Sequence, residues 1–375
     1  MQFQIPEVPL AVLDQIPSPA LVVFRDRVVS NIESMIRVAG DPARLRPHCK
    51  THKMSAVVRM LIDRGVHKHK AATIAEVEML FDAGARDVLL AYNPVGPNIG
   101  RIVKLAEKFR DRTLSVNCDD EGPLRSLSAA SDQSGITIGV FLDLNVGQNR
   151  TGVSPLSQKA KDLYALIRGL PGIQPRGFHV YDGHQRDADI EQRRAAVQEV
   201  WGPVLELRSH CETAGFPVAA MVCGGTPTFP VYASMTDDGI ELSPGTCVFH
   251  DAGYGSHFPD LPFTPAAAVL SRVVSRPAPD LATLDVGNKA IAADPPRGQR
   301  VYLPVAPDAQ QGAHNEEHLV LQSDSLSAMQ PGDHVWAIPV HICPTSALYD
   351  HVVVIEDGQL VDDWPVTSRN RKLTI

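Results

Sequence analysis

Hydrophobic and polar positions follow two different periods along the chain, and the period changes repeatedly from residue 26 onward. Between Arg27 and Val38 the apolar residues recur at helical spacing, which predicts an amphipathic helix. Apolar runs of strand length predict eight strands: Leu45–Cys49, His69–Thr73, Val88–Tyr92, Leu114–Asn117, Ile138–Leu144, Gly177–Tyr181, Ala219–Cys223 and Glu241–Val248. Helical patterns separate most of them: Ser55–Arg64, Ile74–Ala83, Asn98–Phe109, Ser157–Gly169 and Ile190–Ala214.

Eight strands with helical segments between them favour an α/β domain over residues 26–255, built as a (β/α)8 barrel rather than an open sheet. The segment Pro19–Phe24 would make a ninth strand, and we assign it to a second domain. Ligands bind such barrels at the carboxyl ends of the strands. Residues that fall at these ends are Lys50, Asn93, Arg150, Tyr181, Gly224 and Gly245.

The pattern changes after about Tyr254. Five short strands separated by Pro, Gly and Asp turns are expected at Ala267–Arg276, Leu281–Val286, Glu317–Gln322, Asp333–Ile338 and His351–Glu356. Residues 256–375, together with a strand from residues 1–25, therefore predict a C-terminal, mainly β domain.

Composition and charge exclude several classes of protein. The net charge of -8 argues against a surface for nucleic acids or anionic membranes. No apolar run approaches the roughly 20 residues that span a bilayer, and the N-terminus lacks a secretory pattern. The six cysteines have no paired spacing, so a disulfide framework is not expected. These features predict a cytoplasmic protein that binds neither nucleic acid nor membrane.

A cluster of basic side chains follows the first predicted barrel strand. Lys50 lies among His48, His52 and Lys53. A lysine at a strand end can present its amine to a cofactor aldehyde, as pyridoxal phosphate requires. The alternative is a basic surface patch, because short motifs of this kind are common.

Two glycine-threonine turns follow consecutive predicted strands. One contains Gly224, Gly225 and Thr226, and the other contains Gly245 and Thr246. Glycines allow backbone N–H groups to close on a phosphate, and threonine hydroxyls add donors. Late strands of (β/α)8 barrels often carry such a phosphate site. Ordinary turns remain the alternative.

Three further groups of residues, five residues in all, are candidates for chemistry. Arg150 follows a strand between two glycines and can reach a cofactor oxygen, although it could also be a surface arginine. His179 and Tyr181 share one face of a predicted strand and could pack beside a pyridine ring or belong to the core. His341 and Cys343, flanked by prolines, would share a strand face and suit a divalent metal, although this spacing is more often structural.

Taken together, these motifs resemble the D-threonine aldolase and D-serine dehydratase family of pyridoxal-phosphate enzymes with the alanine-racemase fold. The similar motifs are Arg-Pro-His-x-Lys-Thr-His-Lys, Val-Gly-x-Asn-Arg-x-Gly, Gly-Gly-Thr-Pro-Thr, Ser-Pro-Gly-Thr and Pro-x-His-x-Cys-Pro-Thr, in family order over roughly residues 15–360. The stretch from Ile240 to Gly255 is more similar to the aldolases, whereas Cys343 resembles the dehydratases.

The resemblance implies a homodimer with pyridoxal 5'-phosphate in the barrel and a divalent metal (Zn, Mn, Mg or Co) in the β domain. Lys50 would hold the cofactor and act with His52 in catalysis, while His341 and Cys343 would bind the metal. The remaining implied cofactor contacts are Arg150, His179, Tyr181, Gly224, Gly225, Thr226, Gly245 and Thr246.

The implied substrates are small D-β-hydroxy amino acids. An aldolase-like lyase would cleave them to glycine and an aldehyde. A dehydratase acting on D-serine or 3-hydroxyaspartate would instead release a keto acid and ammonia, and this alternative stays open. An amino-acid racemase fits less well, because the metal pair has no place in that chemistry.

Overall fold

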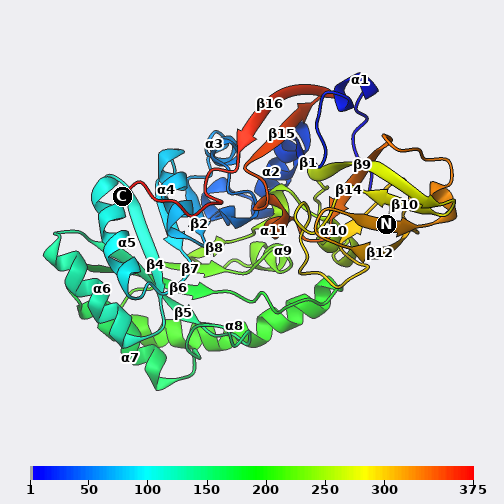
Figure 1. Ribbon diagram of the computed structural model, residues 1–375. Helices are drawn as coiled ribbons and strands as arrows, with labels where there is room; N and C mark the ends of the chain where they lie inside the picture. The colour runs from blue at the N-terminus through cyan, green and yellow to red at the C-terminus, as the bar shows by residue number, and fades with distance from the viewer. Residues whose placement is uncertain (1–2) are drawn as a thin grey trace. The chain divides into compact units, whose positions relative to one another are not determined.

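The computed structural model describes residues 3–375, which form two compact units (Figure 1). Unit 1 contains the chain up to Met35, Thr51–Met54 and Thr246–Arg369, and unit 2 contains Ile36–Lys50, Ser55–Gly245 and Asn370–Ile375. Helix α2 (Arg25–Ala39) therefore contributes residues to both units. Within residues 3–375, every helix is too short or too polar to cross a bilayer.

Unit 2 is built on a parallel sheet in which the strands follow one another in chain order. The strands are β2 (Lys68–Ala71), β3 (Asp87–Leu90), β4 (Thr113–Cys118), β5 (Ile138–Leu144), β6 (Ile173–Val180), β7 (Ala220–Cys223) and β8 (Ile240–Leu242). Its helices are α3 (Ser55–Ile62), α4 (Ile74–Asp82), α5 (Pro97–Lys108), α6 (Glu121–Gln133), α7 (Gln158–Gly169), α8 (Ile190–Thr213) and α9 (Phe229–Ala233).

The ring of strands is completed by an irregular segment instead of a regular eighth strand. Leu45 bridges Leu242 of β8, and His48 bridges Lys70 of β2, both in the parallel sense. Pro47 lies between these bridges and has no N–H to donate, which interrupts the hydrogen-bond ladder. The predicted α/β barrel is confirmed as a fold class, but Leu45–Cys49 is not a strand: its last residue begins a 3-10 turn, η2 (Cys49–Thr51).

Two other expectations in this unit need correction. Helix α6 was not expected, because two of its four buried positions are the serines Ser128 and Ser131, which weaken its apolar stripe. The strand predicted over Glu241–Val248 ends at Leu242, and a 3-10 turn, η3 (Thr246–Val248), belongs to unit 1.

A charged network occupies the barrel interior at the amino ends of the strands. Arg46, with 0% of its side chain exposed, lies 2.8 Å from Asp87 Oδ1 and 2.5 Å from Glu241 Oε2. Lys68 pairs with Glu241 at 2.7 Å, and Arg176 pairs with Asp87 at 2.6 Å. Every charge in this network faces an opposite charge, which offsets the cost of removing it from water. A small apolar cluster also lies in this sheet: Leu89, Phe141, Ala220 and Val222.

Unit 1 is mainly β, as predicted. Its strands are β1 (Ala20–Phe24), β9 (Ala267–Ala278), β10 (Leu281–Leu284), β11 (Val301–Tyr302), β12 (Gln310–His314), β13 (Leu319–Gln322), β14 (His334–Pro339), β15 (His351–Glu356) and β16 (Gln359–Pro365). The short helices are α1 (Leu10–Leu13), α10 (Ala252–His257) and α11 (Ile342–Ser346), with a 3-10 turn η4 (Asp324–Leu326). Strand β1 lies between β9 and β15, so the N-terminal strand is central in this sheet.

Candidate active site

The barrel carries a group of cations around one aromatic ring. Tyr181 directly follows β6, and its ring centroid lies 5.1 Å from Arg150 Cζ and 5.9 Å from Lys50 Nζ. The Nζ atom of Lys70, on β2, lies 5.2 Å from the same centroid. A ring face attracts cations at these distances. The fold thus brings together three residues expected at the cofactor site, Lys50, Arg150 and Tyr181, and adds a second lysine.

His179, on β6, stacks its ring beside that of Tyr181, which follows the strand. The two rings are nearly parallel, at 17°, with centroids 6.3 Å apart. Burial lowers the pKa of His179, so the ring is neutral at pH 7. Its Nδ1 lies 2.6 Å from the Asp143 carboxylate, which accepts the Nδ1 proton. His179 therefore offers a neutral ring of fixed orientation inside the barrel.

The two predicted phosphate turns lie in contact. The backbone N–H of Gly245 donates to Thr226 Oγ1 over 3.2 Å, and the N–H of Gly225 donates to Thr228 Oγ1 over 3.3 Å. Gly224 has φ +70°, and a Cβ there would stand 2.8 Å from the Tyr232 ring. Both amide hydrogen bonds are long, and a phosphate oxygen is a stronger acceptor than a hydroxyl. This glycine-rich cradle fits a phosphate group.

Lys50 lies in the η2 turn and is only partly exposed. Its backbone N–H donates to His48 Nδ1 over 3.3 Å. The ligand-type atoms of His48, Cys49 and Glu76 lie within 4.8 Å of one another. Glu76 already accepts the N–H of Ala72 at the start of α4 over 2.5 Å, and its own N–H donates to the N-cap Thr73. The Cys49 thiol also donates to Glu76 Oε2 over 3.5 Å, so we interpret this carboxylate as a link between the start of α4 and the turn that carries Lys50.

His52, expected to act beside Lys50, lies in unit 1 and is buried, with 1% of its surface exposed. Its Nδ1 accepts the N–H of Met54 over 3.1 Å, and its ring packs edge-on against Phe249 with centroids 6.3 Å apart. These contacts fix the His52 ring in the turn after Lys50, and its role in catalysis stays a prediction.

The expected metal pair does not lie on a strand. Strand β14 ends at Pro339, and His341 is the N-cap of α11, so Cys343 lies in the first turn of that helix. The prediction of a shared strand face is therefore wrong. The two side chains nevertheless meet, because a hydrogen bond joins His341 to Cys343. His341 and Cys343 are brought together by the first turn of α11 and not by their positions along a strand.

Several polar groups surround the metal pair within unit 1. His341 Nδ1 lies 2.5 Å from Asp294 Oδ2. The Thr51 and Thr246 hydroxyls lie 3.2 Å and 3.8 Å from Cys343 Sγ. Burial by itself lowers the pKa of His341, but contacts with Cys343 and Asp294 outweigh it and raise the pKa to about 9. Thr246, expected at the phosphate, thus lies near the Cys343 sulfur.

This set of donors fits a divalent ion. An imidazole and a thiolate are ligands that zinc-like ions prefer, and two protein ligands leave positions for water and substrate. A carboxylate on the far nitrogen of a ligating histidine is also a usual feature of metal sites.

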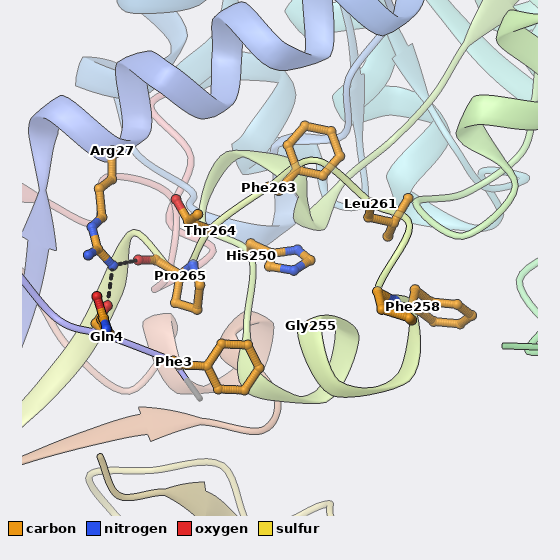
Figure 2. A pocket seen from close by; sticks show the side chains of 11 residues that line it. Phe3, Gln4, Arg27, His250, Gly255, Phe258, Leu261, Phe263, Thr264 and Pro265 are labelled. Atoms are coloured by element: carbon orange, nitrogen blue, oxygen red, sulfur yellow. Dashed lines mark hydrogen bonds between the residues drawn. The ribbon is translucent and has the colours of Figure 1, made fainter. Parts of the chain in front are cut away.

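Unit 1 also contains a cavity of about 330 Å³ (Figure 2). Its walls include three aromatic rings, those of Phe3, Phe258 and Phe263, and His250 points into the space between them. Arg27 donates to the backbone oxygens of Gln4 and Pro265 at its edge. None of the residues that line this cavity belongs to the expected site.

Comparison with known proteins places the chain in a family. The profile described as "Alanine racemase, N-terminal domain" matches residues 23–252, and a serine dehydratase domain profile matches residues 266–355. The chain is 28% identical to the D-threonine aldolase of an Arthrobacter species, over 95% of this chain and 94% of that one. It is 25% identical to the D-threo-3-hydroxyaspartate dehydratase of Delftia sp. strain HT23, over 92% and 96%. The crystal structure of D-threonine aldolase from Filomicrobium marinum superimposes with a TM-score of 0.88 at 27% identity, covering 98% of both chains.

The chain belongs to the alanine-racemase-fold family. Its relatives over nearly the whole length include aldolases and a dehydratase, which are lyases, so the resemblance drawn from the sequence motifs is confirmed. This family depends on pyridoxal phosphate.

Sequence reasoning missed three residues of these two groups: Lys70, Asp143 and Asp294. Lys68 and Lys70 lie two residues apart and therefore share one face of β2. Two lysines on the same face of a predicted barrel strand could have indicated a polar site inside the barrel. Asp143 likewise lies in an otherwise apolar strand. Asp294 lies in an irregular loop far from His341 in sequence, so no local pattern could identify it.

Proposed function

We propose that the protein is a lyase that requires pyridoxal phosphate and a divalent metal and cleaves D-β-hydroxy amino acids to glycine and an aldehyde. The observation that carries this proposal is the similarity to D-threonine aldolases in sequence and in fold over nearly the whole chain. Lys50, Arg150 and Tyr181 converge in the barrel, and His341 with Cys343 supplies metal-type donors.

Each residue has a task in this proposal. Lys50 attaches the cofactor through its amine, and Arg150 and Tyr181 orient it. Gly225, Thr226 and Gly245 bind the phosphate. When bound, the cofactor supplies a ring that accepts the electrons of the bond that breaks. His341 and Cys343 hold the metal, which supplies a Lewis acid for the substrate hydroxyl.

Product analysis tests the reaction. D-Threonine is incubated with the protein, pyridoxal phosphate and Mn²⁺ or Zn²⁺, and the products are identified. Glycine with acetaldehyde is the expected result. Because the lysine and the metal act on fixed positions of the substrate, L-threonine should react far more slowly, and equal rates for both enantiomers would contradict this arrangement.

A dehydratase is the second candidate, favoured by Cys343 and by the similarity to a 3-hydroxyaspartate dehydratase. In that case Lys50 removes the α-proton, and a keto acid and ammonia result. Finding 2-oxobutanoate and no glycine from D-threonine would replace the aldolase by this alternative.

Covalent labelling tests the role of Lys50. Borohydride reduction of the cofactor-loaded protein should leave the cofactor attached to Lys50, as mapped by mass spectrometry of peptides. Lys50→Ala should abolish this label, whereas Lys53→Ala, a change three residues away, should retain it. A label on Lys53 in the wild-type protein would remove Lys50 from this role.

We also propose that the protein is a cytoplasmic homodimer that takes small-molecule substrates, with residues 26–255 as the cofactor domain and residues 256–375 plus the N-terminal strand as the metal domain. Family resemblance supports this proposal, and sedimentation equilibrium of the purified chain tests the dimer. A monomer across micromolar concentrations would contradict it.

A further inference from the structure

Lys70 lies on the inner face of β2, and only 2% of it is exposed. Its backbone is fixed on one side by the parallel bridge to His48, and its N–H donates to Pro47 O over 2.9 Å. The segment that ends in Lys50 therefore lies directly beside the strand that carries Lys70.

The amine of Lys70 faces aromatic and imidazole groups. Its Nζ lies 3.5 Å from His179 Nε2 and 5.2 Å from the Tyr181 ring centroid. Because Asp143 accepts the Nδ1 proton of His179, the Nε2 atom is an acceptor, and Lys70 donates to it. Within the described residues, no carboxylate forms an ion pair with Lys70.

Lys68 makes a sharp contrast on the same face of the same strand. It lies 2.7 Å from Glu241, whose carboxylate balances its charge. The strand thus carries one lysine with a counter-ion and one without.

The charges around Lys70 disfavour its ammonium form. Burial and the Lys50 cation lower the pKa of Lys70 to about 7, and the opposite effects of Asp143 and Asp182 offset this only in part. The titratable or charged groups that face it come from several segments: Lys50, Asp143, Arg150, His179, Tyr181, Asp182 and Cys223. With these protein groups alone around it, the amine is largely neutral at mildly alkaline pH.

We propose that Lys70 is an additional residue of the cofactor site, and that its amine takes up a proton when the phosphorylated cofactor binds in the barrel. A phosphate monoester carries close to two negative charges at neutral pH. Such an anion, held by the turns of Gly225, Thr226 and Gly245, adds negative charge to the part of the barrel where Lys70 and Cys223 interact electrostatically, and the low dielectric there extends its attraction to the amine. This inference rests on the proposed use of pyridoxal phosphate.

Calorimetry of cofactor binding measures the number of protons that the protein takes up when the cofactor binds. Pyridoxal 5'-phosphate is titrated into the cofactor-stripped full chain at about pH 8, in buffers with different ionisation enthalpies, and the dependence on the buffer gives the protons taken up. Lys70→Met and Lys70→Arg should both take up most of one proton fewer than the wild type, since neither side chain titrates there. Lys68→Met is the matched control and should take up as many protons as the wild type.

The affinity for the cofactor distinguishes loss of the positive charge at residue 70 from a general structural effect of the substitution. Lys70→Arg keeps a positive charge and should bind the cofactor within a few-fold of the wild type, whereas Lys70→Met should bind about tenfold more weakly. The inference is overturned if Lys70→Met or Lys70→Arg takes up as many protons as the wild type. It is also overturned if both substitutions weaken cofactor binding equally. If the wild type neither binds the cofactor nor is labelled at Lys50, the proposed function fails. If Lys50 is labelled normally but the Lys70 variants take up as many protons as the wild type, only the role of Lys70 is refuted.

Discussion

At the scale of single residues, Asp294 lies in a loop and contacts the proposed metal ligand His341. Its Oδ2 lies 2.5 Å from His341 Nδ1, so that Nε2 would be the nitrogen that binds the proposed metal. We predict that Asp294→Asn lowers the affinity for Zn²⁺ or Mn²⁺ by about 10- to 100-fold, because the amide binds the imidazole less strongly. Competition with a chromogenic chelator measures this affinity without reference to turnover.

A second histidine–aspartate pair offers the control. His351 Nδ1 lies 2.6 Å from Asp363 on the exposed face of β15 and β16, away from any expected ligand. Asp363→Asn should leave metal affinity unchanged. If both substitutions weaken binding equally, the effect is not specific to the orientation of His341.

At this scale the sequence predicted the residues with distinctive chemistry and missed those that support them. Lys50, Arg150 and Tyr181 were recognised because each follows a predicted strand, and the fold brings them together. Lys70 and Asp143 hold His179 in place from other strands, and only the closed barrel makes them neighbours.

Among the elements, β6 contains a glycine, Gly177, whose backbone conformation would direct a Cβ at its pairing partner Ala220 on β7. Gly177 has φ +128°, and a Cβ there would stand 1.9 Å from the Ala220 carbonyl oxygen. We predict that Gly177→Ala destabilises the protein by more than about 3 kcal/mol, because a backbone group cannot move aside as a flexible side chain can. The pairing of β5 with β6 also shifts register beside this position, between Val140 and Phe141 of β5.

Urea unfolding followed by circular dichroism measures the change, with Gly100→Ala as the control. Gly100 lies in α5, and nothing stands within 4 Å of a Cβ there. Alanine should therefore stabilise the helix by about 0.5–1 kcal/mol. A Gly177→Ala protein as stable as Gly100→Ala would show that β7 can shift to make room.

The elements that were predicted wrongly are those in which tertiary contacts replace the local pattern. Residues 45–48 have the composition of a strand, yet Pro47 limits them to two bridges. Helix α6 packs with serines, so its apolar stripe is too weak to predict. His341 and Cys343 were predicted on a strand because the alternating pattern continues past Pro339, where the backbone turns into α11.

For the whole molecule, the sequence predicted the class of fold from the succession of strands and helices, because that succession is a property of the entire chain. It could not predict what fills the barrel. The interior carries Arg46, Asp87, Glu241, Lys68 and Arg176, which hydrophobic patterns do not distinguish from surface charges. Only the closure of the ring pairs these charges with one another.

This network makes the stability of the barrel depend on pH. Burial alone would raise the pKa of Glu241, but Arg46 and Lys68 outweigh it and lower the pKa below its ordinary range. Since the carboxyl of the unfolded chain has an ordinary pKa of about 4.3, the unfolded state takes up protons first. The stabilisation is therefore fully present at neutral pH and is lost as the pH falls below about 4. Asp87, whose pKa the Arg46 charge also lowers against the effect of burial, changes in the same direction.

We predict that Glu241→Gln costs about 3 kcal/mol at neutral pH, because it leaves Arg46 and Lys68 with one fewer buried counter-charge. The difference from the wild type should shrink as the pH falls below about 4, where the wild-type carboxylate also becomes protonated. Urea midpoints measured from neutral to acid pH test both statements. Glu356→Gln, which removes the exposed partner of Arg25, should differ little from the wild type at any pH. A difference for Glu241→Gln that stays constant down to the most acid pH would mean that this carboxylate does not titrate with unfolding, and that the barrel closes without depending on its charge.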